Sequence, residues 1–339
     1  MSTLGTNSIT TADLRASLDP KGNAAVVYEV LEIASPIVKR GRWMEGNMRS
    51  ANQTTRQAST ETATKRMYER GVAASKTVNV PVIDKCAQYS AFTKVDISKL
   101  EEFPSPEKYL AGQERRKIVA MKSDFESDVF YGNAETDPLD INGLATRFSA
   151  ISTVKGNPGY QVVSAGGSTS LSSLYLIGMG DGGVTFFYPE GSEAGVTRIV
   201  DPKALVNDPT DATKQLYAYC VWNNWKVGLA VEDYRQSFLR IANIDTSALA
   251  TFGSGADTSP DLIGIAIRAM EKLDYKDPTL TYFWAGSETV IGWLKTMYQK
   301  TANVNLTLAT AQDGIETVRL GGIEVIKSDA ILNTESAVS

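Results

Sequence analysis

The sequence predicts an α+β fold in which one long helix accompanies a set of short strands. The helix is predicted over 105–132, because Ser105 is a suitable N-cap and Pro106 takes the first helical position. Between 171 and 231, strands are predicted at four aromatic and β-branched runs that Gly, Pro, Asn and Asp separate; they are 171–180, 184–188, 215–222 and 225–231. With 42% hydrophobic and 22% charged residues, the 339-residue chain can bury a core and form two domains.

The long helix has one apolar stripe and one charged face. Apolar residues recur at helical spacing at Leu110, Ile118, Met121, Phe125 and Val129. A helix of this length with a single apolar stripe is expected to lie across a sheet, although a surface helix of an α/β enzyme has the same pattern. A shorter helix is expected over 24–32. Strands are expected over 77–83, with Pro81 favouring an edge position, and over 89–97.

The C-terminal third alternates between helices and strands. One helix is predicted to begin at Ser259 and another at Ser287, each with apolar residues on one face. Residues 281–285 are predicted to form a buried strand between them. Residues 315–327 are predicted to form a hairpin around the dipeptide Gly321-Gly322.

Residues 41–75 are polar and too poor in apolar side chains to build a core. A segment of this length without structure is usually functional or a linker. From Lys39 to Lys76 there are nine basic and three acidic residues, a net charge of +6, so the rest of a chain of net charge −5 has −11. Either a nucleic acid or an acidic protein surface could bind this segment, and the chain itself supplies the acidic surface.

Several function classes are excluded or disfavoured by composition. The chain contains no histidine, which excludes Ser-His-Asp and Cys-His catalysis and most transition-metal sites. The cysteines, Cys86 and Cys220, have no neighbouring ligand residues and are expected to be reduced. The N-terminus lacks a signal-peptide pattern and no apolar run is long enough to span a membrane, so a cytosolic origin is expected.

The sequence from Gly178 to Gly183 matches the GxGxxG pattern of dinucleotide-binding turns. That chemistry needs a helix N-terminus after the last glycine to hold the pyrophosphate. Here the next residues predict a strand and a turn. We therefore expect a β-turn at these glycines and no nucleotide site.

Two segments, 173–195 and 217–245, resemble the major capsid proteins of tailed bacteriophages with the Hong Kong 97-like fold. Residues 130–148 are similar to the segment after the spine helix in such proteins. The matched motif residues are expected to form turns, pack or pair; they are Pro189, Gly191, Gly195, Trp225, Gly228, Arg235, Arg240 and Asp245. The two arginines are expected to find a carboxylate or backbone carbonyl, since each lies close to apolar runs.

The resemblance implies an order of parts along the chain. It places the N-terminal arm at 1–40, the E-loop with flanking strands at 41–82, and a P-domain that includes the spine helix at 83–159. It implies a β-rich, family-specific region at 160–255, an A-domain at 256–315, and return strands with the C-terminus at 316–339.

The resemblance also implies contacts between subunits. The E-loop residues expected to contact a neighbouring subunit are Arg42, Trp43, Met44, Arg49, Arg56, Lys65, Arg66, Tyr68 and Arg70. Together with Met48 and Met67, the apolar members are expected to be buried there. The basic members are expected to face acidic residues, for which the long helix offers Glu107, Glu114, Asp124, Glu126 and Asp128.

The implied function is assembly into hexamers and pentamers of an icosahedral head that encloses double-stranded DNA in the host cytoplasm. Expected partners are other copies of the chain, a separate scaffolding protein, a portal and decoration proteins, with no cofactor, metal or membrane. One alternative is an encapsulin-like compartment shell. The other is a carboxylate-dependent or nucleotide-binding enzyme, the latter using the turn at 178–183.

Overall fold

The computed structural model describes residues 36–59, 63–103, 105–192, 194–208, 213–250, 261–300, 306–310 and 316–339. They form two compact units. The first unit contains Gln88–Phe125 and Glu193–Lys226, and the second contains Ala34–Ala87, Glu126–Ser192 and Val227–Ser339. The helix expected over 24–32 lies outside the described residues.

The sheet of the second unit is built around strand β5 (Leu171–Met179), which is buried along its whole length. It pairs antiparallel with β10 (Thr281–Gly286) and with β9 (Phe238–Asp245). On the β10 side the sheet continues through β13 (Ile323–Lys327), β12 (Glu316–Leu320) and β11 (Leu306–Thr310). Short strand β4 (Val162–Ser164) runs parallel to β9, and 3-10 helix η1 (Pro158–Gln161) precedes it.

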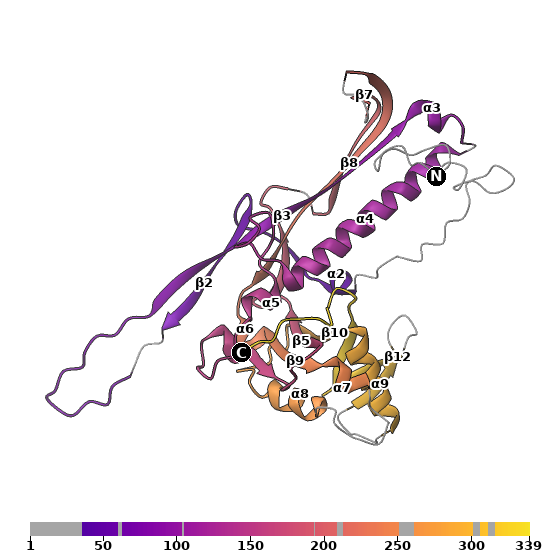
Figure 1. Ribbon diagram of the computed structural model, residues 1–339. Helices are drawn as coiled ribbons and strands as arrows, with labels where there is room; N and C mark the ends of the chain where they lie inside the picture. Colours follow the sequence, from indigo (N-terminus) through magenta and orange to yellow (C-terminus); the bar gives the residue numbers. More distant parts are fainter. Residues whose placement is uncertain are drawn as a thin grey trace. The chain divides into compact units, whose positions relative to one another are not determined.

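The main core of the second unit lies between this sheet and helices α7 (Thr246–Ala250), α8 (Leu262–Met270) and α9 (Glu288–Lys300) (Figure 1). Helix α8 is apolar on its inner face and is capped by Asp261, whose carboxylate accepts a hydrogen bond from the Gly264 amide at 2.9 Å. Ser259, where the sequence predicted this helix to begin, lies outside the described residues. Trp284 of β10 and Leu294 of α9 are fully buried in this core.

Strand β6 (Val184–Tyr188) follows β5 after a glycine turn and links the remaining strands of the second unit. It pairs parallel with β1 (Trp43–Glu45) and antiparallel with the end of β8 (Gln215–Val231). Short helices complete this unit; they are α2 (Pro36–Arg40), α5 (Leu144–Arg147) and α6 (Tyr234–Ser237).

The first unit is a small sheet with a helix on one face. Strand β7 (Val196–Asn207) pairs antiparallel with β8, and β8 neighbours β3 (Val78–Asp96). Helix α4 (Pro106–Tyr131) belongs to this unit as far as Phe125, whose ring packs on the sheet against Tyr89 and Trp225; the three ring centroids lie 5.1–6.1 Å apart. Helix α3 (Ile97–Leu100) closes the end of β3.

Helix α4 confirms the predicted long helix to within one residue at each end. At about 1.5 Å per residue its 26 residues span roughly 39 Å. It ends where the Gly132 amide bonds to the Asp128 carbonyl at 2.9 Å. A Cβ at Gly132 would lie 2.5 Å from the Ile141 carbonyl oxygen, so this end of the helix requires glycine.

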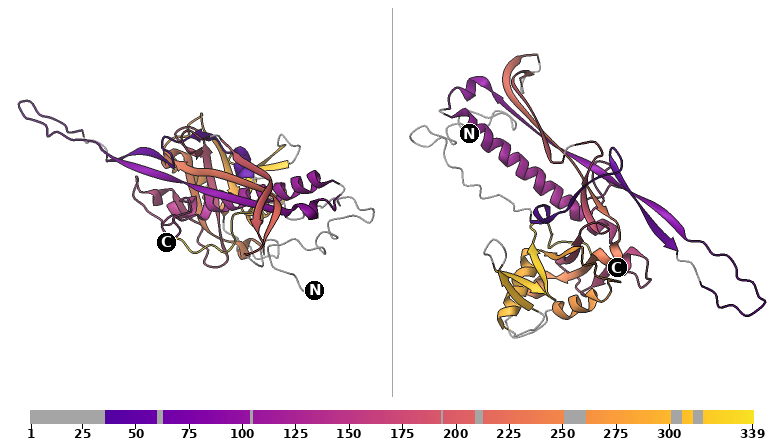
Figure 2. Two further views of the ribbon diagram at one scale, coloured as in Figure 1. Left: turned by 90° about the horizontal axis from the view of Figure 1, so that it is seen from above. Right: turned by 180° about the vertical axis from the view of Figure 1, so that it is seen from behind.

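Strand β2 (Ala51–Ser59) pairs antiparallel with the first part of β3 and forms a two-stranded ribbon (Figures 1 and 2). The sequence predicted two strands over 77–97, whereas the structure has one continuous strand, β3, through Pro81. Likewise, the two strands predicted over 215–231 are the single strand β8. The strand at 281–285 and the hairpin with positive φ at Gly321 and Gly322 are confirmed.

Candidate intersubunit surface and its supports

The described part of the loop between β2 and β3, residues 63–77, is exposed throughout. We call residues 63–77 the extended loop. Its apolar side chains are turned to solvent, since Met67 is 74% exposed and Tyr68 is 99% exposed. The views in Figure 2 show the extended loop at the free end of the β2–β3 ribbon. The basic residues Lys65, Arg66 and Arg70 are also exposed, so this loop presents apolar and cationic groups together.

Arg56 of β2 has hydrogen-bond partners within its own chain, so its expected contact with a neighbouring subunit stays a prediction. Its Nε donates to the Glu232 carbonyl at 3.0 Å, and its second nitrogen donates to the Val231 carbonyl. The guanidinium also lies 5.3 Å from the centre of the Tyr234 ring. Burial lowers the pKa of Arg56, and Asp84 opposes this effect.

A buried ion pair lies beside Arg56. Asp84 of β3 is 1% exposed and lies 2.7 Å from Arg147. Arg147 also donates to the Leu229 carbonyl at 3.1 Å and to the Asn142 carbonyl at 2.8 Å. Two segments distant in sequence, 142–147 and the end of β8, are therefore joined to β3 of the ribbon.

Trp43 and Met44, expected at a subunit contact, are half-buried in β1 of their own chain. The Trp43 ring lies 5.1 Å from that of Phe186, its partner across β1 and β6. The Thr185 hydroxyl donates to the Met44 sulfur at 3.6 Å. These contacts cover part of both side chains within the chain, whereas Arg42, Met48 and Arg49 are exposed. The expected contact of Trp43 and Met44 with a neighbour stays a prediction.

The glycine motif residues form turns and a close approach. Gly191 has φ of 71°, and its amide donates to the Glu45 carboxylate at 2.8 Å. Gly195 also has a positive φ, of 109°. In the same turn region, the Ser192 hydroxyl donates to the Pro189 carbonyl at 2.6 Å. A Cβ at Gly228 would lie 2.5 Å from the Phe187 ring.

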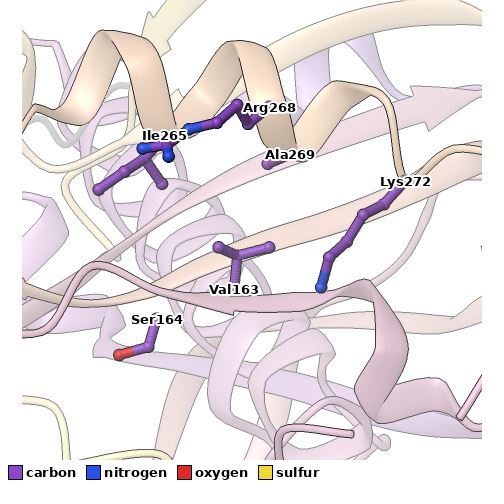
Figure 3. A pocket seen from close by; sticks show the side chains of 6 residues that line it. All are labelled: Val163, Ser164, Ile265, Arg268, Ala269 and Lys272. Carbon is purple, nitrogen blue, oxygen red and sulfur yellow. The ribbon is translucent and has the colours of Figure 1, made fainter. Parts of the chain in front are cut away.

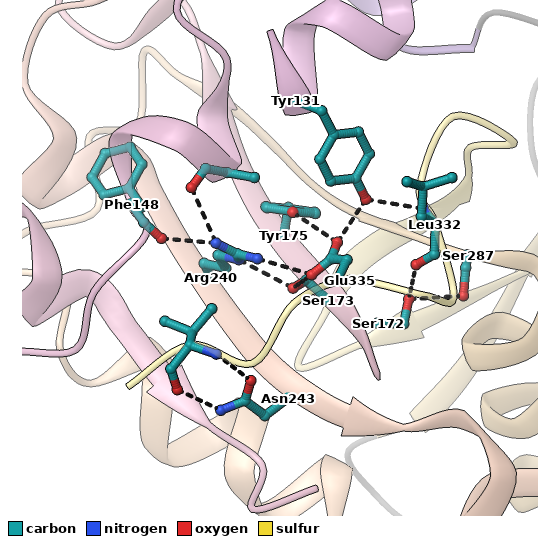
Figure 4. Close-up of polar contacts among 12 residues, drawn as sticks. Tyr131, Phe148, Ser172, Ser173, Tyr175, Arg240, Asn243, Ser287, Leu332 and Glu335 are labelled. Atoms are coloured by element: carbon teal, nitrogen blue, oxygen red, sulfur yellow. Dashed lines mark hydrogen bonds and ion pairs between the residues drawn. The ribbon is translucent and has the colours of Figure 1, made fainter. Parts of the chain in front are cut away.

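Arg240 is the centre of a buried polar network (Figure 4). Its guanidinium donates to the Glu335 carboxylate at 2.8 Å and to the Phe148 carbonyl at 2.8 Å. The expected carboxylate and carbonyl partners are thus both present. Glu335 also accepts the hydroxyl of Tyr131 at 2.6 Å and that of Tyr175 at 3.2 Å. Burial raises the pKa of both tyrosines, so both phenols stay protonated and donate.

The same network fastens the C-terminal segment to the sheet. Asn243 of β9 donates to the Val338 carbonyl at 2.7 Å and accepts from the Val338 amide at 2.9 Å. Glu335 pairs with Leu171 of β5 in an isolated bridge. Nothing in the sequence around Glu335 distinguishes it from a surface carboxylate, so the sequence analysis missed it.

Asp245 and Arg235 have modest structural roles. Asp245 caps α7, accepting from the amides of Ser247 at 3.0 Å and Ala248 at 3.2 Å. Hydrogen bonds, with that from the Ser247 hydroxyl the largest, lower the pKa of Asp245. Arg235 has a 47% exposed side chain, and its nearest carboxylate is Asp233 at 3.4 Å.

Gly178 lies in strand β5, and Gly180, Gly182 and Gly183 form the tight turn between β5 and β6. The Gly180 amide donates to the Val184 carbonyl at 3.2 Å, and the Gly183 amide donates to the Gly180 carbonyl at 3.1 Å. Strand β6 begins at Val184, as predicted, where a dinucleotide site would place a helix.

A pocket of about 290 Å³ lies between β4 and α8 (Figure 3). Its lining combines apolar side chains with two cations; the residues are Val163, Ser164, Ile265, Arg268, Ala269 and Lys272. The Lys272 ammonium donates to the Tyr160 carbonyl at 3.1 Å. Within the described ranges, no group of three or more acidic or cysteine side chains could hold a metal ion. No helix in the same ranges is long and apolar enough to cross a membrane.

Comparison with known proteins identifies the family. A family model described as major capsid protein GP7 matches residues 19–339. No curated protein matches the chain. Among solved structures it is similar to a chain of bacteriophage epsilon15, with 24% identity and a TM-score of 0.77 over 100% of this chain and 99% of that one.

Two further likenesses are weaker. The bacteriophage JBD30 capsid has 11% identity and a TM-score of 0.49, over 95% of this chain and 99% of that one. The SrpI encapsulin from Synechococcus elongatus PCC 7942 has 11% identity and a TM-score of 0.44, over 70% and 96%. Because the family model matches almost the whole chain, the chain belongs to the major capsid proteins of tailed bacteriophages, with the Hong Kong 97-like fold.

Proposed function

We propose that the chain assembles into hexamers and pentamers of an icosahedral head and that the extended loop of each subunit contacts the next subunit. The exposure of Tyr68 at 99% is the main support. A subunit contact that covers Tyr68 and the neighbouring Met67 would remove the apolar surface of both side chains from water, and this burial favours assembly. The positive charge of the loop complements a chain whose remainder is acidic.

We propose the following division of the fold. Helix α4 is the spine helix of the P-domain at 83–159, and residues 41–82 are the E-loop with its flanking strands. Residues 160–255 are the family-specific region, 256–315 the A-domain, and 316–339 the return strands. The N-terminal arm is 1–40. The end of α4 at Gly132 and the ribbon of β2 with β3 support the first two assignments.

The remaining partners follow from this role. A head that is filled with double-stranded DNA contacts it non-specifically, and the acidic balance of the chain suits a lining that does not hold DNA tightly. A scaffolding protein, a portal and decoration proteins would act during or after assembly in the host cytoplasm. No cofactor is required.

We also infer that the chain is not an enzyme and that the turn at 178–183 binds no nucleotide. The strand after this turn supports the inference, since it leaves no helix N-terminus for a pyrophosphate. Purified protein titrated with ATP or NAD should show no saturable thermal shift. A saturable shift that disappears in Gly180→Val, while Gly156→Ala retains it, would restore the nucleotide-binding alternative.

Assembly can be tested directly with the purified full chain. Size-exclusion chromatography and negative-stain electron microscopy should show closed particles. Replacing Met67 and Tyr68 by serine should reduce particle yield at least tenfold and leave the circular dichroism spectrum unchanged. As a matched control, Leu139→Ser removes a 78% exposed apolar side chain elsewhere and should leave the yield unchanged. Equal yields in all three proteins would contradict the proposed role of the loop.

A further inference from the structure

The sheet of the first unit has an exposed apolar row on neighbouring strands. Phe92 of β3, Trp222 of β8 and Ile199 of β7 are 47%, 48% and 63% exposed. The rings of Phe92 and Trp222 lie 5.9 Å apart in an edge-on arrangement, and Ile199 is the cross-strand partner of Trp222. Single exposed apolar residues are common, but a contiguous row with two aromatic rings is typical of an interaction surface.

Polar side chains border the apolar row on both sides. On one side the Ser90 hydroxyl donates to the Asn224 side chain at 3.0 Å, which forms a neutral border. On the other side Asp201 of β7 is exposed, and its carboxylate accepts the Lys203 amide at 3.1 Å. The row therefore offers a partner an apolar strip with the Asp201 carboxylate at one border. Lys94 of β3 lies at the same border, where its ammonium donates to the Asn207 carbonyl at 2.6 Å.

The extended loop has the complementary chemistry. It presents Met67 and Tyr68 at 74% and 99% exposure, with Arg66 and Arg70 beside them. A surface of aromatic and aliphatic side chains bordered by a carboxylate fits an apolar pair flanked by guanidinium groups. Both surfaces belong to one chain, so a second copy supplies either partner in a head-to-tail contact that can close into a ring.

Glu114 and Glu126 of α4, two of the five acidic residues that the sequence analysis favoured as partners of the loop, are less suitable. Glu114 already binds Arg198 through two hydrogen bonds of 2.8 and 2.9 Å. Glu126 is 1% exposed and accepts the Ser328 hydroxyl at 2.7 Å. The Glu114 carboxylate is therefore already paired, and the Glu126 carboxylate is out of reach of a second subunit.

We propose that Met67 and Tyr68 dock on the row formed by Phe92, Trp222 and Ile199 of a second copy. An arginine of the loop then pairs with Asp201. This inference rests on the proposed function, because it takes the loop to reach a neighbouring subunit, and it adds the surface on which the loop lands. The contact is heterologous, so each subunit is donor to one neighbour and acceptor to another.

Site-specific photo-crosslinking in assembled particles tests the proposal. A benzophenone amino acid replaces Tyr68, and particles are assembled from a mixture of isotopically light and heavy subunits. Mass spectrometry should find mixed-isotope crosslinks from residue 68 to peptides within 88–96, 196–207 or 215–226. Crosslinks to other peptides of a second subunit would overturn the docking surface and leave the proposed function intact. If every crosslink joined two peptides of the same isotopic label, the loop would contact only its own chain, and this would contradict the proposed function itself.

A double-mutant cycle provides an independent readout. Tyr68→Ala and Trp222→Ala should each raise the protein concentration required for assembly about tenfold, and the double variant should raise it no further than the stronger single variant. Tyr275→Ala, which removes a 62% exposed tyrosine elsewhere, serves as the control and should have no effect. Strictly additive effects of Tyr68→Ala and Trp222→Ala would overturn the proposed contact.

Discussion

Arg240 and Glu335 are 95 positions apart in sequence, yet their charged groups lie 2.8 Å apart and their side chains are only 4% and 5% exposed. A buried ion pair is stable only when further hydrogen bonds satisfy both groups. Here carbonyl oxygens and the hydroxyl of Ser173 surround Arg240, while two tyrosine hydroxyls donate to Glu335. The pair therefore fixes the C-terminal segment against β5 and β9.

Removing one member of this pair should be strongly destabilising. Glu335→Ala leaves the Arg240 charge buried without its carboxylate, at a cost of about 3–5 kcal/mol. Thermal unfolding of the purified protein should show a midpoint lower by roughly 10 °C. Lys327→Met, which removes an exposed pair with Glu288, is the control and should change the midpoint little. Equal midpoints for both variants would contradict a structural role for the pair.

Local signals in the sequence predicted some elements well. The ends of α4 are set by Pro106 and by the glycine after Tyr131, so the prediction differs from the structure by one residue at each end. The sequence predicted two strands in place of β8, because Asn223 and Asn224 between them resemble a turn. In the structure Asn223 is fully buried and Asn224 bonds to Ser90 across the strands, so tertiary pairing overrides the local preference.

Arg56 should hold the base of the β2–β3 ribbon. Because its guanidinium donates to the Val231 and Glu232 carbonyls, Arg56→Ala should raise hydrogen-exchange rates of β2 amides about tenfold. Arg49→Ala, at an exposed arginine just before β2, should leave those rates unchanged. Mass spectrometry of peptides within 51–59 checks this. The same exchange in both variants would show that Arg56 does not restrain the ribbon.

Glu232 should give the stability of the protein a specific pH dependence. Burial raises the pKa of Glu232, partly offset by the hydrogen bond from the Gly182 amide. The ionised form of Glu232 is therefore disfavoured in the folded state. The stability that the protonated form contributes is lost as the pH rises through the folded pKa. Glu232→Gln retains an acceptor for Gly182, so it should stabilise the protein at pH 7.

That gain should vanish below the ordinary pKa of 4.5, where the glutamate is already protonated. Unfolding midpoints of the wild type and Glu232→Gln, measured at pH 7 and pH 4, check both predictions. A constant difference between the two proteins across this range would mean that ionisation of Glu232 has no part in it.

Salt should weaken assembly if the charge of the extended loop contributes to it. Raising the salt concentration from 0.1 to 1 M shortens the Debye length from about 10 to 3 Å and screens exposed pairs. Light scattering should therefore show slower assembly of the wild type at 1 M salt. Arg66→Gln with Arg70→Gln should assemble slowly at both salt concentrations, whereas Arg319→Gln, at an exposed arginine of β12, should behave as the wild type. Salt-independent wild-type assembly would exclude the charge contribution.

Residues of the candidate surface were partly predictable. The basic, coreless character of 41–75 indicated an extended segment, and its residues 63–75 are exposed. Strands β1 and β2 also lie in this segment and were not predicted. The same composition could not separate Arg56 from Arg66, since the Arg56 partners are carbonyls of residues 175 and 176 positions away. Strand β7 was missed because its exposed residues lack an alternating apolar pattern.

Cryo-electron microscopy of self-assembled particles tests most directly whether the extended loop joins neighbouring subunits. Residues 63–77 of each subunit should contact an adjacent subunit in the reconstruction, with the Tyr68 side chain buried in the contact. Particles in which Tyr68 remains exposed, or contacts only its own chain, would contradict the intersubunit role of the loop.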